Sequence, residues 1–599
     1  MQSYQEQYIR NTREIARLVD FYAVPASDYA SWYDRQKEAN ERLQVLKKEN
    51  DSLLSEHFFP ALDGLLSASE EDLKDLTDFA AQLMDWRTNL DTGIFVLVHD
   101  ALLSLARLRR DRDAVIRELY QLGMGLYYEN RMAQGVSSEY SLPFYIEDEM
   151  VFTEAGSYLK YFSEIEKEET KGYIIRGLAN ISIATMDRRK RVAIGKQIIS
   201  ILQDPFYRDQ APGLPWDTYL RRAHQQMSST RSSLSTGGLR PDELEAIFES
   251  CAVVFKPEEG QNNPNIRWLW PYYEMEYSCG FATMEQTLNR MEQLIQSSDP
   301  EQYDESGLYG NVQLPIYYGR LLKANPSFEG RERRLRFLKT AYERMLRMLM
   351  KFPTEKINEQ LYYELLLVIT DYYELPEVMP YETLVQELMK RYTGRLFIRA
   401  RRTGELLKRF CAKICAAEPD FFDDIPFLKA IQDPEQKRKR LLQYAEHCGL
   451  FYDFGMIKMN VERLFQTRSL FEREARIREL HTISGAEDLL RRSSTETYAD
   501  IALGHHRYYN GNDGYPASYI RNRSPYRQMT DVVAVAAFLI NSSDPDKDAV
   551  IDEVIEGAHR RFSPLVTVYL SDREFREEVK ALMLSDGEVY YREVYDTMR

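Results

Sequence analysis

The segment from Tyr452 to Pro516 contains three blocks that stand out from the rest of the chain: YDFGMIKM at 452–459, HTISGAEDLL at 481–490 and HHRYYNGNDGYP at 505–516. Only eight histidines occur in 599 residues, and five of them lie between positions 447 and 559. Imidazole is a common metal ligand and titrates near neutral pH. A single histidine is most simply a surface residue, but this grouping predicts a metal or phosphate site.

The order and spacing of the blocks resemble the signature of the HD-GYP family, bacterial phosphodiesterases that open cyclic di-GMP at a bi- or trinuclear iron or manganese site. The family blocks read HDIGK, HPEIGAEIL and HHExxDGxGYP. Asp453 and His481 are 28 positions apart (481 − 453), which suits the family spacing. The run FSPLVTVYL at 562–570 is similar to the closing helix of the family. The resemblance covers roughly the last third of the chain and implies an all-helical domain.

Four positions that are functional in the family carry other residues here. Tyr452 stands in place of the histidine of the His–Asp pair, and Met456 in place of the lysine that helps to bind phosphate. Arg399, in FIRARRTGELL at 397–407, replaces a ligand histidine. Ala537, in VAVAAFLI at 533–540, replaces a ligand aspartate. The resemblance therefore implies a degenerate site.

The ligand positions that still match the family are Asp453, His481, His505 and His506, and those that match its catalytic residues are Asp453 and His505. Three imidazoles and one carboxylate suit a single Fe, Mn or Zn ion. A di- or trinuclear cluster needs more bridging carboxylates. If Arg399 points inward, it repels a cation or binds a phosphate through its planar guanidinium. We expect either no metal or one divalent ion.

The GYP turn and the loop after it supply further candidate residues. Glycine permits an unusual backbone conformation and proline fixes φ, so both would shape the turn beside the pocket. Arginines after this turn could clamp an anionic ligand through bidentate contacts, or form an exposed basic loop. The candidate ligand-binding residues are Gly514, Tyr515, Pro516, Arg521, Arg523 and Arg527.

The whole chain is expected to be all-α. Hydrophobic residues make up 44%, while glycine (28) and proline (23) are scarce for this length. Long amphipathic runs with little punctuation predict helices. One example is SEEDLKDLTDFAAQLMDW at 69–86, where Ser69 is the expected N-cap. Successive helix pairs before residue 385 resemble tetratricopeptide-like repeats with an irregular period, and a plain irregular bundle is the alternative.

Two breaks suggest the domain organisation. The Ser/Thr/Gly-rich stretch at 227–243 and the proline-containing stretch at 371–383 interrupt the helical pattern. We expect a helical region at 1–236, a second at 237–384 that is either separate or continuous with the first, and the HD-GYP-like domain at 385–599. In RWLWPYYEMEY at 267–277, Trp268 and Trp270 are two positions apart and are not expected to face inward together. A partner surface is one interpretation of this aromatic patch, and a core is the other.

Composition limits the cellular setting. The formal charge of −16 argues against general nucleic-acid binding, because phosphate backbones require clustered cations. The first residues lack a signal-peptide pattern, and the longest apolar run, at 532–540, is too short to span a bilayer. These features predict a cytoplasmic protein. The expected partners are a cyclic dinucleotide, proteins bound through the helical region, and a second copy of the chain in a homodimer.

Two hypotheses for function follow. The first is a bacterial signalling protein in which a helical N-terminal region regulates a catalytically impaired module that binds a nucleotide or a protein. The second is an active cyclic di-GMP phosphodiesterase with a mononuclear or otherwise altered metal site. The lost ligands favour the first, since ligand replacement removes the charge that holds a cluster.

Overall fold

The computed structural model describes residues 2–19, 28–84, 90–130, 138–185, 187–229, 239–256, 266–302, 304–326, 330–351, 368–369, 372, 374–459 and 467–597. Within these ranges the chain forms helices and no β-strand, which confirms the predicted all-α class. The extended pairing in these ranges consists of three isolated bridges. One of them joins Arg507 to Gly514 in the third sequence block.

The first part of the chain forms helices that pack against their neighbours in sequence. They are α1 (Gln2–Leu18), α2 (Tyr29–Leu53), α3 (Phe59–Asp63), α4 (Glu70–Leu83), α5 (Thr92–Arg109), α6 (Arg112–Asn130) and α7 (Ser138–Ser157). Ser69 caps α4 as predicted, and it forms a capping box with Asp72. Both residues therefore satisfy backbone N–H groups that the first turn of a helix leaves without partners.

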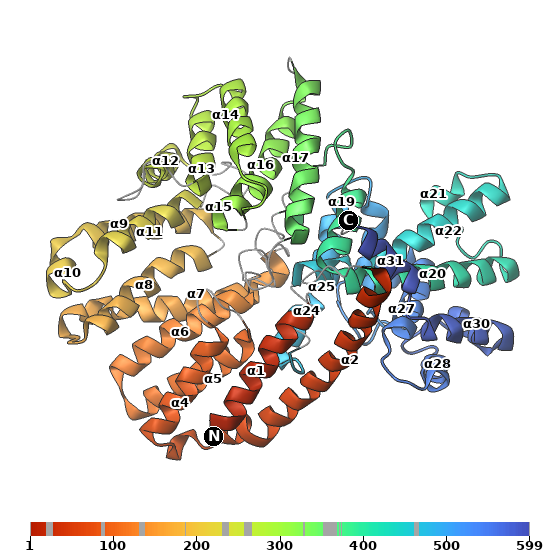
Figure 1. Ribbon diagram of the computed structural model, residues 1–599, viewed down its shortest axis with the longest axis horizontal. Coiled ribbons are helices and arrows are strands. Elements are labelled where there is room, and N and C mark those ends of the chain that lie inside the picture. The colour runs from red at the N-terminus through yellow and green to blue at the C-terminus, as the bar shows by residue number, and fades with distance from the viewer. Residues whose placement is uncertain are drawn as a thin grey trace.

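The middle of the chain continues the same arrangement. Its helices are α8 (Glu168–Ala184), α9 (Arg188–Gln203), α10 (Pro205–Gln210), α11 (Trp216–Ser229), α12 (Pro241–Phe255), α13 (Ile266–Ser278), α14 (Met284–Ser297), α15 (Glu305–Leu308), α16 (Leu314–Ala324) and α17 (Arg331–Lys351). In Figure 1 the helices from α4 to α17 follow one another along an arc, orange through yellow to green. A repeat relationship between the helix pairs stays a prediction.

The aromatic patch at 267–277 belongs to the core. Trp268 and Trp270 are both buried in α13, so the prediction that they could not both face inward is wrong. The reason is that α13 packs against α12 on one side and α14 on another, which leaves little of its surface open. Trp270 stacks on Tyr317 of α16 with ring centroids 4.7 Å apart.

The last part of the chain carries the three sequence blocks. Its helices are α19 (Tyr381–Tyr392), α20 (Gly394–Ala417), α21 (Pro426–Lys429), α22 (Pro434–Phe451), α24 (Glu472–Glu479), α25 (His481–Leu490), α26 (Ala499–Gly504), α27 (Arg527–Asn541), α28 (Lys547–Glu556), α29 (Pro564–Thr567), α30 (Arg573–Leu584) and α31 (Glu588–Thr597). The expected boundary at 384 falls within α19, and the expected boundary at 236 lies outside the described residues.

The second helix of the chain packs against the last one. Helix α2, in red, lies beside the C-terminal helix α31, in dark blue (Figure 1), and the two are in contact. Trp32 packs on Tyr595 with centroids 5.4 Å apart, and Tyr29 donates a hydrogen bond to the Glu588 carbonyl at 2.9 Å. One apolar core includes these rings together with residues of α16, α17 and the C-terminal helices named above other than α24. Among the described helices, none has the length and apolar character needed to cross a membrane.

Candidate functional site

Two glycines bring the first and second sequence blocks together. A short 3-10 helix (Phe454–Met459) lies against the first turns of α25. A Cβ atom on Gly455 would lie 1.9 Å from the carbonyl oxygen of His481, and one on Gly485 would lie 3.0 Å from the Gly455 nitrogen. The backbone approach therefore requires glycine at position 455, and a Cβ at position 485 would be tight. The contact fixes the residues around Asp453 relative to the start of α25.

Three of the predicted ligands form one cluster. His481, His505 and His506 each offer a ring nitrogen, and these nitrogens lie within 4.8 Å of one another. The Nε2 atoms of His481 and His505 are 3.4 Å apart. His481 is at the start of α25, while the other two histidines directly follow α26. The α25–α26 contact therefore positions all three imidazoles.

Main-chain carbonyls fix the tautomers of two of these histidines. Nδ1 of His481 is 2.7 Å from the Arg478 carbonyl oxygen, and Nδ1 of His505 is 2.9 Å from that of Ala502. A carbonyl oxygen only accepts, so each Nδ1 carries the hydrogen and each Nε2 presents a lone pair. Burial lowers the pKa of His481, and it lowers the pKa of His505 to about 4. Both rings are thus neutral near pH 7, which is the form that binds metals.

Asp453 joins the cluster to an arginine. Its Oδ1 is 3.3 Å from His481 Nε2, and its Oδ2 accepts a hydrogen bond from Arg399 Nη2 at 2.7 Å. Arg399 therefore points inward, the case in which its charge was expected to repel a cation or to bind a phosphate. Burial by itself would raise the pKa of Asp453, but Arg399 and the neighbouring imidazoles outweigh it, so the pKa is lowered. The carboxylate is ionised and already neutralised by a guanidinium.

Two of the spacings within the donor set suit a single metal ion. Tetrahedral zinc with Zn–N distances of about 2.0–2.1 Å places two ligand nitrogens about 3.4 Å apart. The observed Nε2–Nε2 distance of 3.4 Å and the Nε2–Oδ1 distance of 3.3 Å match such edges. A second ion would need a bridging carboxylate. Asp453 cannot serve, because Arg399 holds its other oxygen and brings a positive charge there.

Three of the four positions that were expected to carry substituted ligands are occupied by packing residues. Tyr452 is buried, and its ring meets His505 edge-on with centroids 5.1 Å apart. Met456 and Ala537 are also buried in the same apolar core. Lys458, two positions after Met456, is fully buried and pairs with Asp488 of α25 at 2.6 Å. This lysine therefore ties the 3-10 helix to α25 and does not face a ligand.

The GYP turn covers one side of the cluster. Tyr515 stacks on His506 with centroids 4.6 Å apart. Gly514 has φ +74°, and a Cβ there would lie 2.2 Å from the His506 carbonyl oxygen. Arg507 donates to the Gly514 carbonyl at 2.8 Å, and the bond before Pro516 is cis. The turn is thus held against the histidines by its backbone and by one aromatic ring.

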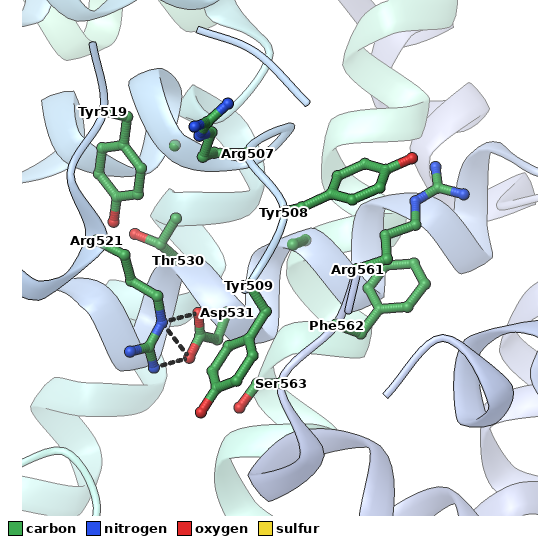
Figure 2. A pocket seen from close by; sticks show the side chains of 12 residues that line it. Arg507, Tyr508, Tyr509, Tyr519, Arg521, Thr530, Asp531, Arg561, Phe562 and Ser563 are labelled. Atoms are coloured by element: carbon green, nitrogen blue, oxygen red, sulfur yellow. Dashed lines mark hydrogen bonds and ion pairs between the residues drawn. The ribbon is translucent and has the colours of Figure 1, made fainter. Parts of the chain in front are cut away.

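The three predicted arginine clamps do not converge on one point. Arg521 forms an ion pair with Asp531, at 2.8 Å from Nε to Oδ1, and Figure 2 shows this pair among the side chains that line a small hollow. The hollow has about 280 Å³ of atom-free space, partly open to solvent. Arg527 pairs with Asp424, and Arg523 is exposed. Their charges are therefore committed to separate partners or to solvent.

Two further arginines lie near the cluster, and the sequence reasoning missed them. The pKa of His506 is well below its usual value, first because of burial and the other two histidines, and then because of Arg478 and Arg561. The position of Arg478, three residues before His481 in a helical segment, was a usable signal. Arg561 is more than 50 positions away from the cluster, so only the fold reveals it. Both are partly exposed, and Arg561 is paired with Glu553 at 3.5 Å, which offsets part of its charge.

Comparisons with protein-family models, with curated proteins and with solved structures gave no match to this chain.

Proposed function

We propose that residues 385–599 form a degenerate HD-GYP-like module that holds one divalent ion and binds an anionic nucleotide without hydrolysing it, under the control of the helical N-terminal region. The observation that carries the proposal is the Arg399–Asp453 ion pair beside three clustered histidines. It leaves imidazole donors for one ion while removing the carboxylate that a cluster would share.

The residues that would hold the ion are His481, His505 and His506, with Oδ1 of Asp453 beside them. Hydrogen bonds from Nδ1 to main-chain carbonyls orient metal-binding imidazoles in many proteins. A bound zinc, iron or manganese ion would act as a Lewis acid toward a ligand oxygen. Tyr452 and Tyr515 shield the imidazoles from solvent on two sides, which strengthens electrostatic interactions within the site.

The charge of the site favours an anionic ligand. Arg399 neutralises Asp453, so a bound ion would keep its full positive charge toward the ligand. Arg478 and Arg561 lie close enough to shift the pKa of His506 and add to this potential. Phosphate oxygens suit both arginines and a divalent ion. The resemblance to HD-GYP proteins suggests a cyclic dinucleotide as the ligand.

The same ion pair argues against hydrolysis. Attack on a phosphodiester requires a base that removes a proton from water, and an efficient base has a pKa near the working pH. The pKa of Asp453 is lowered, with Arg399 as its strongest charged neighbour, so this carboxylate is a poor base. We therefore expect binding of the nucleotide with little or no turnover.

Metal and nucleotide titrations test the proposal. The full chain is stripped with a chelator and titrated with Zn²⁺ or Mn²⁺ by calorimetry, and then with cyclic di-GMP while the linear product is followed by chromatography. We expect one ion per chain, with affinity lowered at least about tenfold in His505→Ala. His559→Ala is the matched control, since His559 is exposed and outside the cluster. Two ions per chain would contradict the proposal.

The alternative function is a phosphodiesterase with a single ion. It is favoured by the 3.4 Å separation of the His481 and His505 Nε2 atoms, which suits an ion that activates water. Product formation from cyclic di-GMP that disappears in His505→Ala would establish this alternative. Product formation that survives the substitution would place the chemistry elsewhere in the chain.

A further inference from the structure

The arginine segment, residues 467–479, connects the N-terminal helices to the histidine cluster. It starts at Thr467, continues as α24 and ends at Glu479, and one residue, Leu480, separates it from α25. Helix α2 holds its beginning: Asn50 donates to the Thr467 carbonyl at 2.9 Å, and Asp51 accepts from the Ser469 N–H at 2.7 Å. The start of the segment is therefore bonded to residues more than 400 positions earlier in the chain.

Arg468 is seated in a buried carboxylate socket. Its side chain is 2% exposed and contacts Asp91 at 2.8 and 3.0 Å and Glu474 at 2.8 Å. Tyr8 donates to Asp91 at 2.6 Å, which completes the hydrogen bonding of that carboxylate. A Cβ on Gly93 would lie 2.4 Å from Arg468 Nη2, so the socket has no spare room. Buried charges of this kind persist only when they are paired.

Arg473 is seated in a second socket, formed by α6 and α7. Its guanidinium contacts Glu129 at 2.5 Å, donates to Asn130 Oδ1 at 2.6 Å and pairs with Glu147. Glu129 is buried, whereas Glu147 is half exposed. The second socket is thus open to solvent on one side, in contrast to the first.

Helix α24 links these sockets to a ligand of the cluster. Glu474 pairs with Arg468 and also accepts from the Phe471 N–H at 2.9 Å, which caps the first turn of α24. At the other end, the Arg478 carbonyl holds Nδ1 of His481 at 2.7 Å. A single helix of eight residues therefore separates the N-terminal sockets from the imidazole.

We propose that the N-terminal helical region controls the histidine cluster by seating or releasing Arg468 and Arg473. When both guanidinium groups are seated, α24 keeps its place and His481 Nε2 stays directed at His505. Release moves the carbonyl that fixes the ring, and the site loses affinity. The inference rests on the proposed function, because binding at the cluster is the property controlled. Coupling of this kind can be carried by a chain of hydrogen bonds and ion pairs, and these contacts form such a chain.

The test uses Arg473→Gln in the full chain, with Arg476→Gln as control. Arg476 is exposed on the same helix, so its loss changes charge without opening a socket. Hydrogen exchange is measured over 467–490, and Zn²⁺ affinity by competition with a chromophoric chelator. In Arg473→Gln we expect exchange about tenfold faster in α24 and α25 and Zn²⁺ binding about tenfold weaker. The control should match the parent in both.

Glu147→Gln provides a second variant, because it opens the same socket from its exposed side and leaves the buried first socket intact. We expect a change in the same direction. The proposal is overturned if both variants match Arg476→Gln, or if exchange rises in α24 while α25 and Zn²⁺ affinity stay unchanged. If the parent binds no Zn²⁺, the proposed function fails. In that case the rate of hydrogen exchange in α25 alone tests the coupling. Faster exchange in the two variants than in the control supports it, and an unchanged rate refutes it.

Discussion

At the scale of single residues, Gly455 is the position on which the site geometry depends most directly. An alanine Cβ there would lie 1.9 Å from the His481 carbonyl oxygen and 2.8 Å from the Gly485 nitrogen. Both are backbone atoms that cannot rotate away, so we expect Gly455→Ala to lower the free energy of unfolding by about 3 kcal/mol. Urea unfolding measures this change. In the control Gly64→Ala, whose nearest atom would be 3.4 Å away, we expect a change within about 0.5 kcal/mol.

The sequence predicted which histidines gather but not how the charged residues pair. The order and spacing of the sequence blocks predict that His481, His505 and His506 lie together, and they form one cluster in the structure. The partner of an arginine depends on tertiary packing, which spacing does not encode. Arg527 pairs with Asp424, 103 positions earlier, and the Arg399–Asp453 pair requires α20 to face the turn after α22. These contacts decide the charge of the site.

At the scale of helices, α7 contains a buried acid that should make stability depend on pH. Burial raises the pKa of Asp148 to about 8, from an ordinary value of 3.8. The folded state therefore binds the proton more tightly than the unfolded chain. The resulting stabilisation is complete below about pH 3.8 and is lost as the pH rises through about 8, by at most about 1.4 kcal/mol per pH unit.

Asp148→Asn removes this titration while keeping the size of the side chain. We expect the variant to gain stability relative to the parent as the pH rises from 5 to 8.5, as measured by urea unfolding at fixed ionic strength. Asp78→Asn, at an exposed position of α4, is the control for the loss of one carboxylate charge. A constant difference for Asp148→Asn would mean that this carboxyl does not titrate in that range.

The positions of helices and of their caps can be predicted from the sequence, whereas the number of buried faces of a helix is harder to predict. Ser69 was predicted as an N-cap because a small polar side chain precedes acidic residues and an amphipathic run, and the structure confirms it. Trp268 and Trp270 were judged as if α13 had a single inward face. Neighbouring helices cover more than one face, and a sequence pattern does not state how many neighbours a helix has.

At the scale of the whole molecule, the contact between α2 and α31 should make these two helices unfold together. The aromatic spacing of Tyr29, Trp32 and Tyr33 indicates a buried face, but nothing in the sequence identifies α31 as its partner. Trp32 is 1% exposed, so we expect Trp32→Ala to cost about 3–5 kcal/mol. Hydrogen exchange should accelerate in α31 as well as in α2. Leu66→Ala, at a side chain that is 74% exposed, should alter neither helix. Faster exchange confined to α2 would show that α31 is held by α19 and α20 alone, and that α2 and α31 are not coupled.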